Sequence, residues 1–229
     1  MNETASLPEF EVRPMRPEDV GAVARMHRGF IENGEFRGYS IANLGLDFLE
    51  KVFYRLNMDN PHFFADVALF RGEVIGFIVY ASDRRVFRET LRRHSVAIAF
   101  ATAKMVLRHP VKFTRHIWGN LGLLTDALPA EVKEAHGWGF LMGVKPEYRR
   151  IRLELGKGVW PAGELWKNME RTLRAKGCDQ VWTVAGDHNS KMLLLHRLQG
   201  MEPVAEGRVQ GLPSTYFRKF LKDTPKKPS

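Results

Sequence analysis

The first third of the chain combines helical and strand-like spacing of its apolar residues. Leu44, Phe48, Val52 and Leu56 recur every four residues, which is the spacing of one helix face. Two β-rich runs flank Arg71-Gly72-Glu73, and such a turn is typical of a hairpin. Another helix is expected to open at Pro17, with two acids in its first turn. The pattern predicts, in order, a strand, two helices and a hairpin: Phe10–Met15, Pro17–Phe30, Leu44–Leu56, Phe63–Phe70 and Val74–Tyr80.

The rest of the chain predicts a long helical segment followed by alternating strands and helices. Residues 84–136 have a helical pattern, broken at His109-Pro110 because proline cannot continue a helix. Pro161 marks the start of one helix, and Gly177 and Gly200 mark the ends of two. The expected elements are helix Val86–Leu107, helix Pro129–His136, strand Phe140–Val144, helix Pro161–Ala175, strand Gln180–Ala185, helix Ser190–Leu198, and closing strands Pro203–Val209 and Tyr216–Phe220. This order predicts a mixed α/β sheet with a helical excursion in its middle.

Composition narrows the class of protein. With 229 residues, 44% of them hydrophobic, the chain can bury one sizeable core, so we expect a single domain over residues 10–220 and a flexible tail over 221–229. Cys178 is the only cysteine, so no disulfide can form within the chain. The start carries acids and no apolar run, and no stretch offers about 18 uncharged apolar residues. We therefore expect a soluble, cytoplasmic protein.

Positive charge is concentrated in the helical excursion. Residues 84–116 contain nine lysines and arginines against one acid, Glu89, which accounts for +8 of the net +9. Residues 95–107 are almost entirely apolar and are flanked by basic residues. Three accounts stay open: a helical pair packed over the sheet, an interfacial helix in peripheral contact with a membrane, or a surface for an acidic partner. No helix-turn-helix or finger pattern accompanies the charge, so we expect no nucleic-acid partner.

The turn after strand Phe140–Val144 has the composition of an anion-binding site. Lys145, Arg149 and Arg150 precede Gly156-Lys157-Gly158, and a helix follows. Glycine lets main-chain N–H groups approach a phosphate, and a helix N-terminus favours its charge. The turn is no P-loop, since no Lys-Ser or Lys-Thr follows its glycines, and it is no dinucleotide fingerprint, since Pro161 stands where a glycine would be needed.

Two blocks of residues resemble the GNAT superfamily of acyl-CoA N-acyltransferases. Val144, Pro146, Tyr148 and Arg149 match the family's Val-x-Pro-x-Tyr-Arg, which leads into a glycine-rich pyrophosphate loop. Asn189, Gly200 and the apolar Met201 match its second block. The resemblance implies a mostly antiparallel sheet flanked by helices, with the basic insert 84–136 between the third and fourth strands. It also implies acetyl-CoA, or another acyl-CoA, as cosubstrate, with direct transfer of the acyl group to an amine.

The resemblance assigns roles to individual residues. The main chain of strand Phe140–Val144 would hold the pantetheine arm and polarise the thioester. His196 stands where the family often has a tyrosine that protonates the departing thiolate. Asp187 would be the base, with Glu35, Glu73 and His188 as alternatives, and Glu35 and Tyr80 would contact the acceptor. The expected cofactor contacts are Met142, Gly143, Val144, Arg149, Arg150, Gly156, Lys157, Gly158 and Asn189.

Two departures from the family pattern keep other functions open. Five residues, Ile151–Leu155, separate Arg150 from Gly156 where the family has one or two, and histidine replaces the tyrosine at 196. His196 can equally be a packed helix residue. The alternatives are an inactive acyl-CoA-binding or regulatory module, and a membrane-surface acyltransferase for a lipid-linked or long-chain substrate. No histidine or cysteine pairing suggests a metal, so we expect none. A homodimer stays open.

Overall fold

The computed structural model describes residues 9–34, 45–83, 85–96, 98–100, 103, 128–152, 158–209 and 211–221. Its strands are β1 Phe10–Pro14, β2 Phe63–Phe70, β3 Glu73–Ala81, β4 Gly137–Val144, β5 Ile151–Arg152, β6 Gly158–Val159, β7 Gln180–Gly186, β8 Glu202–Val209 and β9 Leu212–Phe220. Its helices are α1 Val20–Glu32, α2 Leu46–Phe48, α3 Val86–Arg93, α6 Ala130–Lys133, α7 Pro161–Ala175 and α8 Ser190–Leu198. A π-helical turn, Leu49–Tyr54, and 3-10 turns at Arg55–Asn57 and Pro146–Tyr148 complete the elements.

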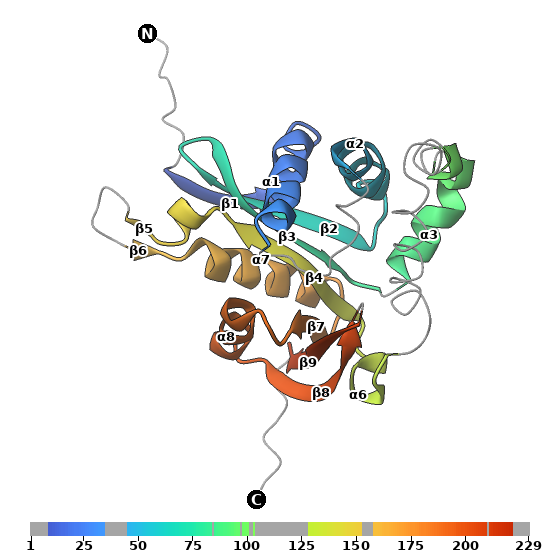
Figure 1. The fold of residues 1–229 in the computed structure, drawn as a ribbon, viewed down its shortest axis with the longest axis vertical. Helices are drawn as coiled ribbons and strands as arrows, with labels where there is room; N and C mark the ends of the chain where they lie inside the picture. Colours follow the sequence, from blue (N-terminus) through green and yellow to red (C-terminus); the bar gives the residue numbers. More distant parts are fainter. Residues whose placement is uncertain are drawn as a thin grey trace, which may run out of the picture.

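Seven strands form one sheet in the order β1-β2-β3-β4-β7-β9-β8. Every neighbouring pair is antiparallel except β4 and β7, which run parallel at the centre of the sheet. The two short strands β5 and β6 form a separate hairpin before α7 (Figure 1). The fold class expected from the sequence, a mixed and mostly antiparallel sheet flanked by helices, is therefore confirmed.

Helices cover both faces of the sheet, and each face has its own apolar core. Phe77 and Val79 of β3 pack with α1 and the Leu49–Tyr54 turn on one face. Ile78 and Tyr80 point to the other face, where α7 lies. This alternation along β3 follows from the two-residue period of a strand. Figure 1 shows α1 and α2 on one side of the sheet and α7 and α8 on the other.

Two predicted helices differ from those observed in the N-terminal half. The first helix begins at Val20 rather than Pro17; residues 17–19 form a turn that leads into it, and this turn is held by the carboxylate of Asp19. The carboxylate accepts hydrogen bonds from Arg13 Nη1 at 2.6 Å and from the main-chain N–H of Arg16 at 2.8 Å. The second expected helix is split between α2, a π-helical turn and a 3-10 turn, which together expose one side and bury Leu49, Val52, Phe53 and Tyr54.

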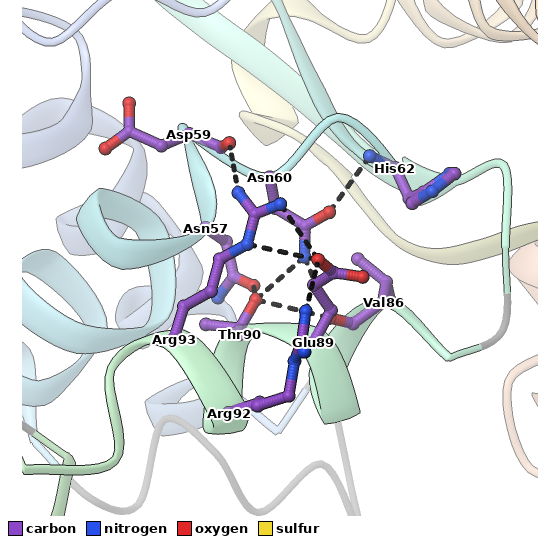
Figure 2. A network of polar contacts seen from close by, with 9 residues as sticks. All are labelled: Asn57, Asp59, Asn60, His62, Val86, Glu89, Thr90, Arg92 and Arg93. Carbon is purple, nitrogen blue, oxygen red and sulfur yellow. Dashed lines mark hydrogen bonds and ion pairs between the residues drawn. The ribbon is translucent and has the colours of Figure 1, made fainter.

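A buried polar network fixes α3 to the segment before β2 (Figure 2). Asn60 Nδ2 donates to the carbonyl of Val86 at 2.8 Å and to Thr90 Oγ1 at 2.9 Å. Thr90 Oγ1 donates to Asn57 Oδ1 at 2.6 Å. Within the described residues, α3 and α6 are helical as expected, although α6 covers only part of the predicted Pro129–His136. Most of 101–127, where the helical prediction continues, lies outside the described residues.

Candidate functional site

The parallel pair at the centre of the sheet separates soon after it begins. β4 and β7 are in register only at Gly137 with Val181 and at Trp138 with Trp182. The indoles of Trp138 and Trp182 stack at this root, with ring centroids 5.1 Å apart and planes 3° from parallel. Beyond Trp138, no further pair of described residues joins β4 to β7. The two strands therefore open a V-shaped gap inside an otherwise continuous sheet.

A β-bulge at Phe140 accompanies this separation. In the pairing of β3 with β4, Tyr80 lies opposite Gly139 and Val79 opposite Leu141, so Phe140 is an extra residue. A bulge bends its strand and increases the local twist, and bulges are frequent beside functional sites. The bend lies two residues past the last β4–β7 pair, where the gap starts.

The main chain of β4 turns its donors toward this gap. Lys145 N donates to Ile75 O at 2.9 Å, so the N–H of Lys145 points to β3. Successive N–H groups of a strand point to opposite sides, which directs those of Val144 and Met142 toward the β7 side. The amides of Met142 and Val144 therefore face the gap between β4 and β7.

Gly143 lies between those two residues and faces the opposite side of the sheet. A Cβ atom at Gly143 would stand 2.2 Å from Cε2 of Phe30 on α1, closer than any real contact allows. Glycine is therefore required here so that the Phe30 ring can pack directly on the β4 main chain. Phe30 was not predicted as a site residue, and no local sequence signal marks it.

The gap continues into a large cleft of about 1240 Å³. It brings together most of the expected cofactor residues: Met142, Gly143, Val144, Arg149, Arg150, Gly158 and Asn189. It also includes residues that the sequence did not single out as site residues: Phe30, Gly34, Ile151, Val159, Trp160, Met192, Leu194, Leu195 and Leu198. The volume exceeds the usual range of about 300–1,000 Å³ for small-molecule pockets, so the cleft can hold a large, extended ligand.

One end of the cleft is basic. Arg149 and Arg150 line it, and Arg149 Nε donates to the carbonyl of Val144 at 3.3 Å. Lys145 points elsewhere, because it pairs with Glu73, which also accepts from Tyr148 Oη at 3.2 Å. The lysine holds the pKa of the Glu73 carboxyl below its usual value. This contact ties the turn after β4 to β3 and gives Glu73 a structural partner.

The N-terminus of α7 adjoins this basic end. Pro161 stands at the first helical position and has no N–H, so Ala162 and Gly163 supply the first main-chain donors of the helix. Such a helix start favours bound anions. Gly156 and Lys157, two of the predicted cofactor contacts, lie outside the described residues. The short β5–β6 hairpin occupies the position of the loop that the sequence showed to be lengthened.

A smaller cavity of about 60 Å³ extends between β4 and β7 and includes His196. His196 is 2% exposed, and burial lowers the pKa of its imidazole to about 4. Nε2 lies 3.2 Å from Thr183 Oγ1, and no described residue pairs with Nδ1. The ring also packs on Phe217 with centroids 4.8 Å apart. At neutral pH this histidine is therefore an uncharged imidazole in the inner cavity wall.

The residues that follow β7 diverge in position. Asp187 lies at the surface, where its Oδ1 accepts from Thr215 Oγ1 at 2.8 Å, and it lines neither cavity. His188 lines both cavities, and its ring rests on Gly186, where a Cβ would lie 2.5 Å from Cε1. Asn189 also lines both and caps α8 by accepting from Met192 N at 3.1 Å. Of the predicted bases that the structure describes, His188 is the one that reaches the cleft.

One of the two predicted acceptor contacts, Tyr80, is not brought to the cleft. Tyr80 is buried beneath α7, where its hydroxyl donates to Asp66 Oδ2 at 2.8 Å and burial raises its pKa well above the usual value. Tyr80 is part of the apolar core because its side chain lies on the face of β3 that packs against α7. Glu35 lies outside the described residues. Within the described part of the chain there is no group of three or more side chains suited to a metal, and no helix is long and apolar enough to cross a bilayer.

The sequence matches no family model and no curated protein. The fold, by contrast, has many solved counterparts. An N-acetyltransferase from Staphylococcus aureus superposes with a TM-score of 0.58 at 13% identity, over 94% of this chain and 100% of its own. The Salmonella typhimurium protein yncA, solved with acetyl-CoA, gives 0.55 at 12% identity, over 97% and 99%. A ribosomal-protein-alanine N-acetyltransferase from Brucella melitensis gives 0.54 at 15% identity, over 92% and 99%. This chain therefore has the fold of the GNAT acetyltransferases.

Proposed function

We propose that the protein transfers an acetyl or other acyl group from acyl-CoA to an amine. The observation that carries this proposal is the gap between β4 and β7, into which the β4 main chain directs the amides of Met142 and Val144. A thioester placed there would have fixed N–H donors beside its carbonyl oxygen. Such donors stabilise the oxyanion of the tetrahedral intermediate without having to reorganise during the reaction.

The basic end of the cleft would bind the diphosphate of coenzyme A. Arg149 and Arg150 supply positive charge, and the first turn of α7 supplies main-chain donors. The pantetheine arm would then run along β4 toward the inner cavity. Fixing both ends of the arm holds the thioester in one orientation, which removes much of the entropic barrier to attack.

Transfer would be direct. The amine nitrogen attacks the thioester carbonyl carbon, a C–N bond forms, and the C–S bond breaks to release the CoA thiolate. A base must take one proton from the amine, and His188 is the best-placed described candidate because it lines both cavities. Asp187 keeps a weaker claim, since its carboxylate is held by Thr215 on β9.

His196 would act as a neutral hydrogen-bonding group. Because burial lowers its pKa to about 4, His196 is a neutral imidazole at neutral pH and lacks the acidic proton of an imidazolium that could be given to a thiolate. Its imidazole can still border the sulfur from the inner cavity and orient it. Direct protonation by His196, as the family tyrosine would do, is therefore the less favoured of the two roles.

The proposal is tested with purified protein, acetyl-CoA and a panel of amines. We expect acetyl-CoA to raise the melting temperature and at least one amine to release free CoA thiol above the rate of hydrolysis. Protection without turnover for any amine would support the inactive acyl-CoA-binding module instead. Absence of both protection and turnover would refute acyl-CoA chemistry altogether.

One surface of the insert favours an additional contact with an anionic membrane. Val96 and Phe100 are 83% and 75% exposed and lie one helical turn apart, and Arg92, four residues before Val96, is 80% exposed. Apolar side chains beside arginines suit the boundary between acyl chains and anionic headgroups. Flotation with phosphatidylserine vesicles should recover the wild type, and the double change Val96→Ser and Phe100→Ser should reduce recovery. Equal recovery of both proteins would exclude this surface.

A further inference from the structure

The rim of the cleft exposes apolar side chains that a soluble protein ordinarily covers. Among the described residues, six large hydrophobic side chains are exposed, and three of them, Trp160, Leu194 and Leu198, line this one cleft. Exposed apolar surface gathered in one place commonly marks a binding groove. The cleft therefore has to accept an apolar part of its ligand in addition to anionic groups.

Trp160 has an unusual position within this rim. It is the N-cap of α7, yet its side chain makes no capping hydrogen bond, so tryptophan brings no local advantage to the helix start. Its indole instead folds back over the first turn. A Cβ at Gly163 would lie 2.4 Å from Cε3 and 3.0 Å from Cδ2 of the indole, so only glycine leaves room for the ring there. With its ring packed on Gly163, Trp160 is still 40% exposed.

Trp160 lies near the basic end of the cleft, where the diphosphate is proposed to bind. Ile151 pairs with Val159 between β5 and β6, so Arg150 and Trp160 each adjoin this strand pair, and both line the same cavity. In the proposed function the thioester would lie near Met142, beside the inner cavity that Met142 and His196 line. In coenzyme A, one phosphate of the diphosphate carries the pantetheine arm with the thioester, and the other carries adenosine. An aromatic ring beside the diphosphate and away from the thioester would therefore face the adenosine.

We propose that Trp160, seated on Gly163, stacks on the adenine of coenzyme A and makes this subsite selective for the nucleotide half of the cofactor. This inference rests on the proposed function and deepens it. An indole face suits a purine because both rings are flat and polarisable, and stacking of a base on an aromatic side chain is a strong contact. Leu194 and Leu198 would extend the apolar rim along α8.

The test compares two ligands that share the pantetheine arm and its phosphate but differ in whether they carry a base. CoA contains adenosine, whereas 4′-phosphopantetheine retains the arm and one phosphate but has no base. Calorimetry would measure the affinity of each for wild type, Trp160→Ala, Trp160→Phe and Gly163→Ala. Phe220→Ala is the matched control, since Phe220 is 45% exposed but lies on β9 and does not line the cleft.

We expect Trp160→Ala to weaken CoA binding roughly 5- to 100-fold, the range that base stacking provides, while 4′-phosphopantetheine binding changes less than about twofold. Trp160→Phe should restore most of the CoA affinity, and Gly163→Ala should weaken it by displacing the indole. Phe220→Ala should leave both affinities unchanged. Thermal unfolding of each variant checks that the fold is intact.

Two results would overturn the inference while leaving the proposed function in place. One is equal loss of affinity for both ligands in Trp160→Ala, which would assign the indole to the pantetheine or phosphate. The other is unchanged CoA affinity in that variant. Failure of the wild type to bind either ligand would instead overturn the proposed function, and the adenine subsite with it.

Discussion

The two walls of the cleft are built from different parts of the chain. The β4 wall presents main chain: the amides of Met142 and Val144, with Gly143 packed against Phe30 behind them. The facing wall, from β7 through α8, presents side chains, chiefly His188, Asn189 and His196. The β4 wall depends on the pairing register of β4 with β3 and on the absence of a side chain at Gly143, so few substitutions there would keep its geometry. The second can exchange one hydrogen-bonding side chain for another, which is consistent with histidine at a position where the family often has tyrosine.

The largest effect is expected from the side-chain wall if His188 is the base. Removing a positioned general base commonly costs 10²-fold or more, so His188→Ala should lower kcat at least about 100-fold with little change in acyl-CoA affinity. Asp187→Asn is the matched control, because Asp187 lies one residue away but lines neither cavity. Steady-state kinetics would show the contrast, and a larger loss for Asp187→Asn would reverse the assignment.

The main-chain wall is tested by filling the space that Gly143 leaves. In Gly143→Ala the new methyl would lie 2.2 Å from the Phe30 ring, and overpacking of this kind costs about 1–3 kcal/mol. We expect the free energy of unfolding to fall by that amount in urea titrations, and CoA affinity to fall roughly tenfold as β4 shifts. Adding Phe30→Leu should recover part of both losses. Additive losses in the double variant would mean that the two residues do not press on each other.

A smaller effect is expected at His196. His196→Phe keeps the ring but removes both nitrogens, so kcat should fall about tenfold while the affinity for acyl-CoA stays near that of wild type. Because burial keeps the pKa of His196 near 4, the pH profile of kcat between pH 6 and 9 should have the same shape in both proteins. Asparagine at this position should restore part of the rate. A titration near pH 6 that disappears in His196→Phe would show that the residue acts as an acid after all.

The smallest effect is a pH dependence of stability. Burial lowers the pKa of His196 to about 4 and that of His27, beside Tyr54, to about 3, whereas a histidine in the unfolded chain titrates near 6.5. Between pH 4 and 6.5 the unfolded chain therefore binds protons that the folded chain does not, and stability falls as pH falls. Each histidine contributes a slope of up to about 1.4 kcal/mol per pH unit. Urea unfolding at pH 5 and 6 should give a shallower slope for His196→Asn than for wild type.

Elements whose ends are set by neighbouring residues were predictable from sequence. α7 and α8 have the predicted bounds, because Pro161 starts the first, Asn189 caps the second, and Gly177 and Gly200 follow them with positive φ. The start of α1 was predicted at Pro17 but lies at Val20, after a turn in which the Asp19 carboxylate pairs with Arg13 on β1, a contact made by the tertiary fold. Helix ends that are set by a proline, a capping residue or a glycine can be read directly from the sequence. Contacts between residues on different strands and helices cannot.

The same division explains the site. The basic turn, strand Phe140–Val144 and Asn189 could be proposed from sequence because they belong to contiguous motifs, and the structure places them along one cleft. Phe30 and Trp160 were missed, since each reaches the cleft only where a glycine elsewhere leaves space for its ring. Tyr80 was expected to contact the acceptor, but strand alternation turns it into the core beneath α7.

The stacked indoles at the root of the gap have a consequence for the whole molecule. Trp138 and Trp182, with the two register pairs there, are the join between the β1–β4 half of the sheet and the β7–β9 half. A ligand lying between the open arms would bridge halves that the backbone itself leaves apart. Occupancy of the cleft should therefore strengthen the cohesion of the entire sheet, and an acyl-CoA bound there as proposed would act as a missing strand as well as a reactant.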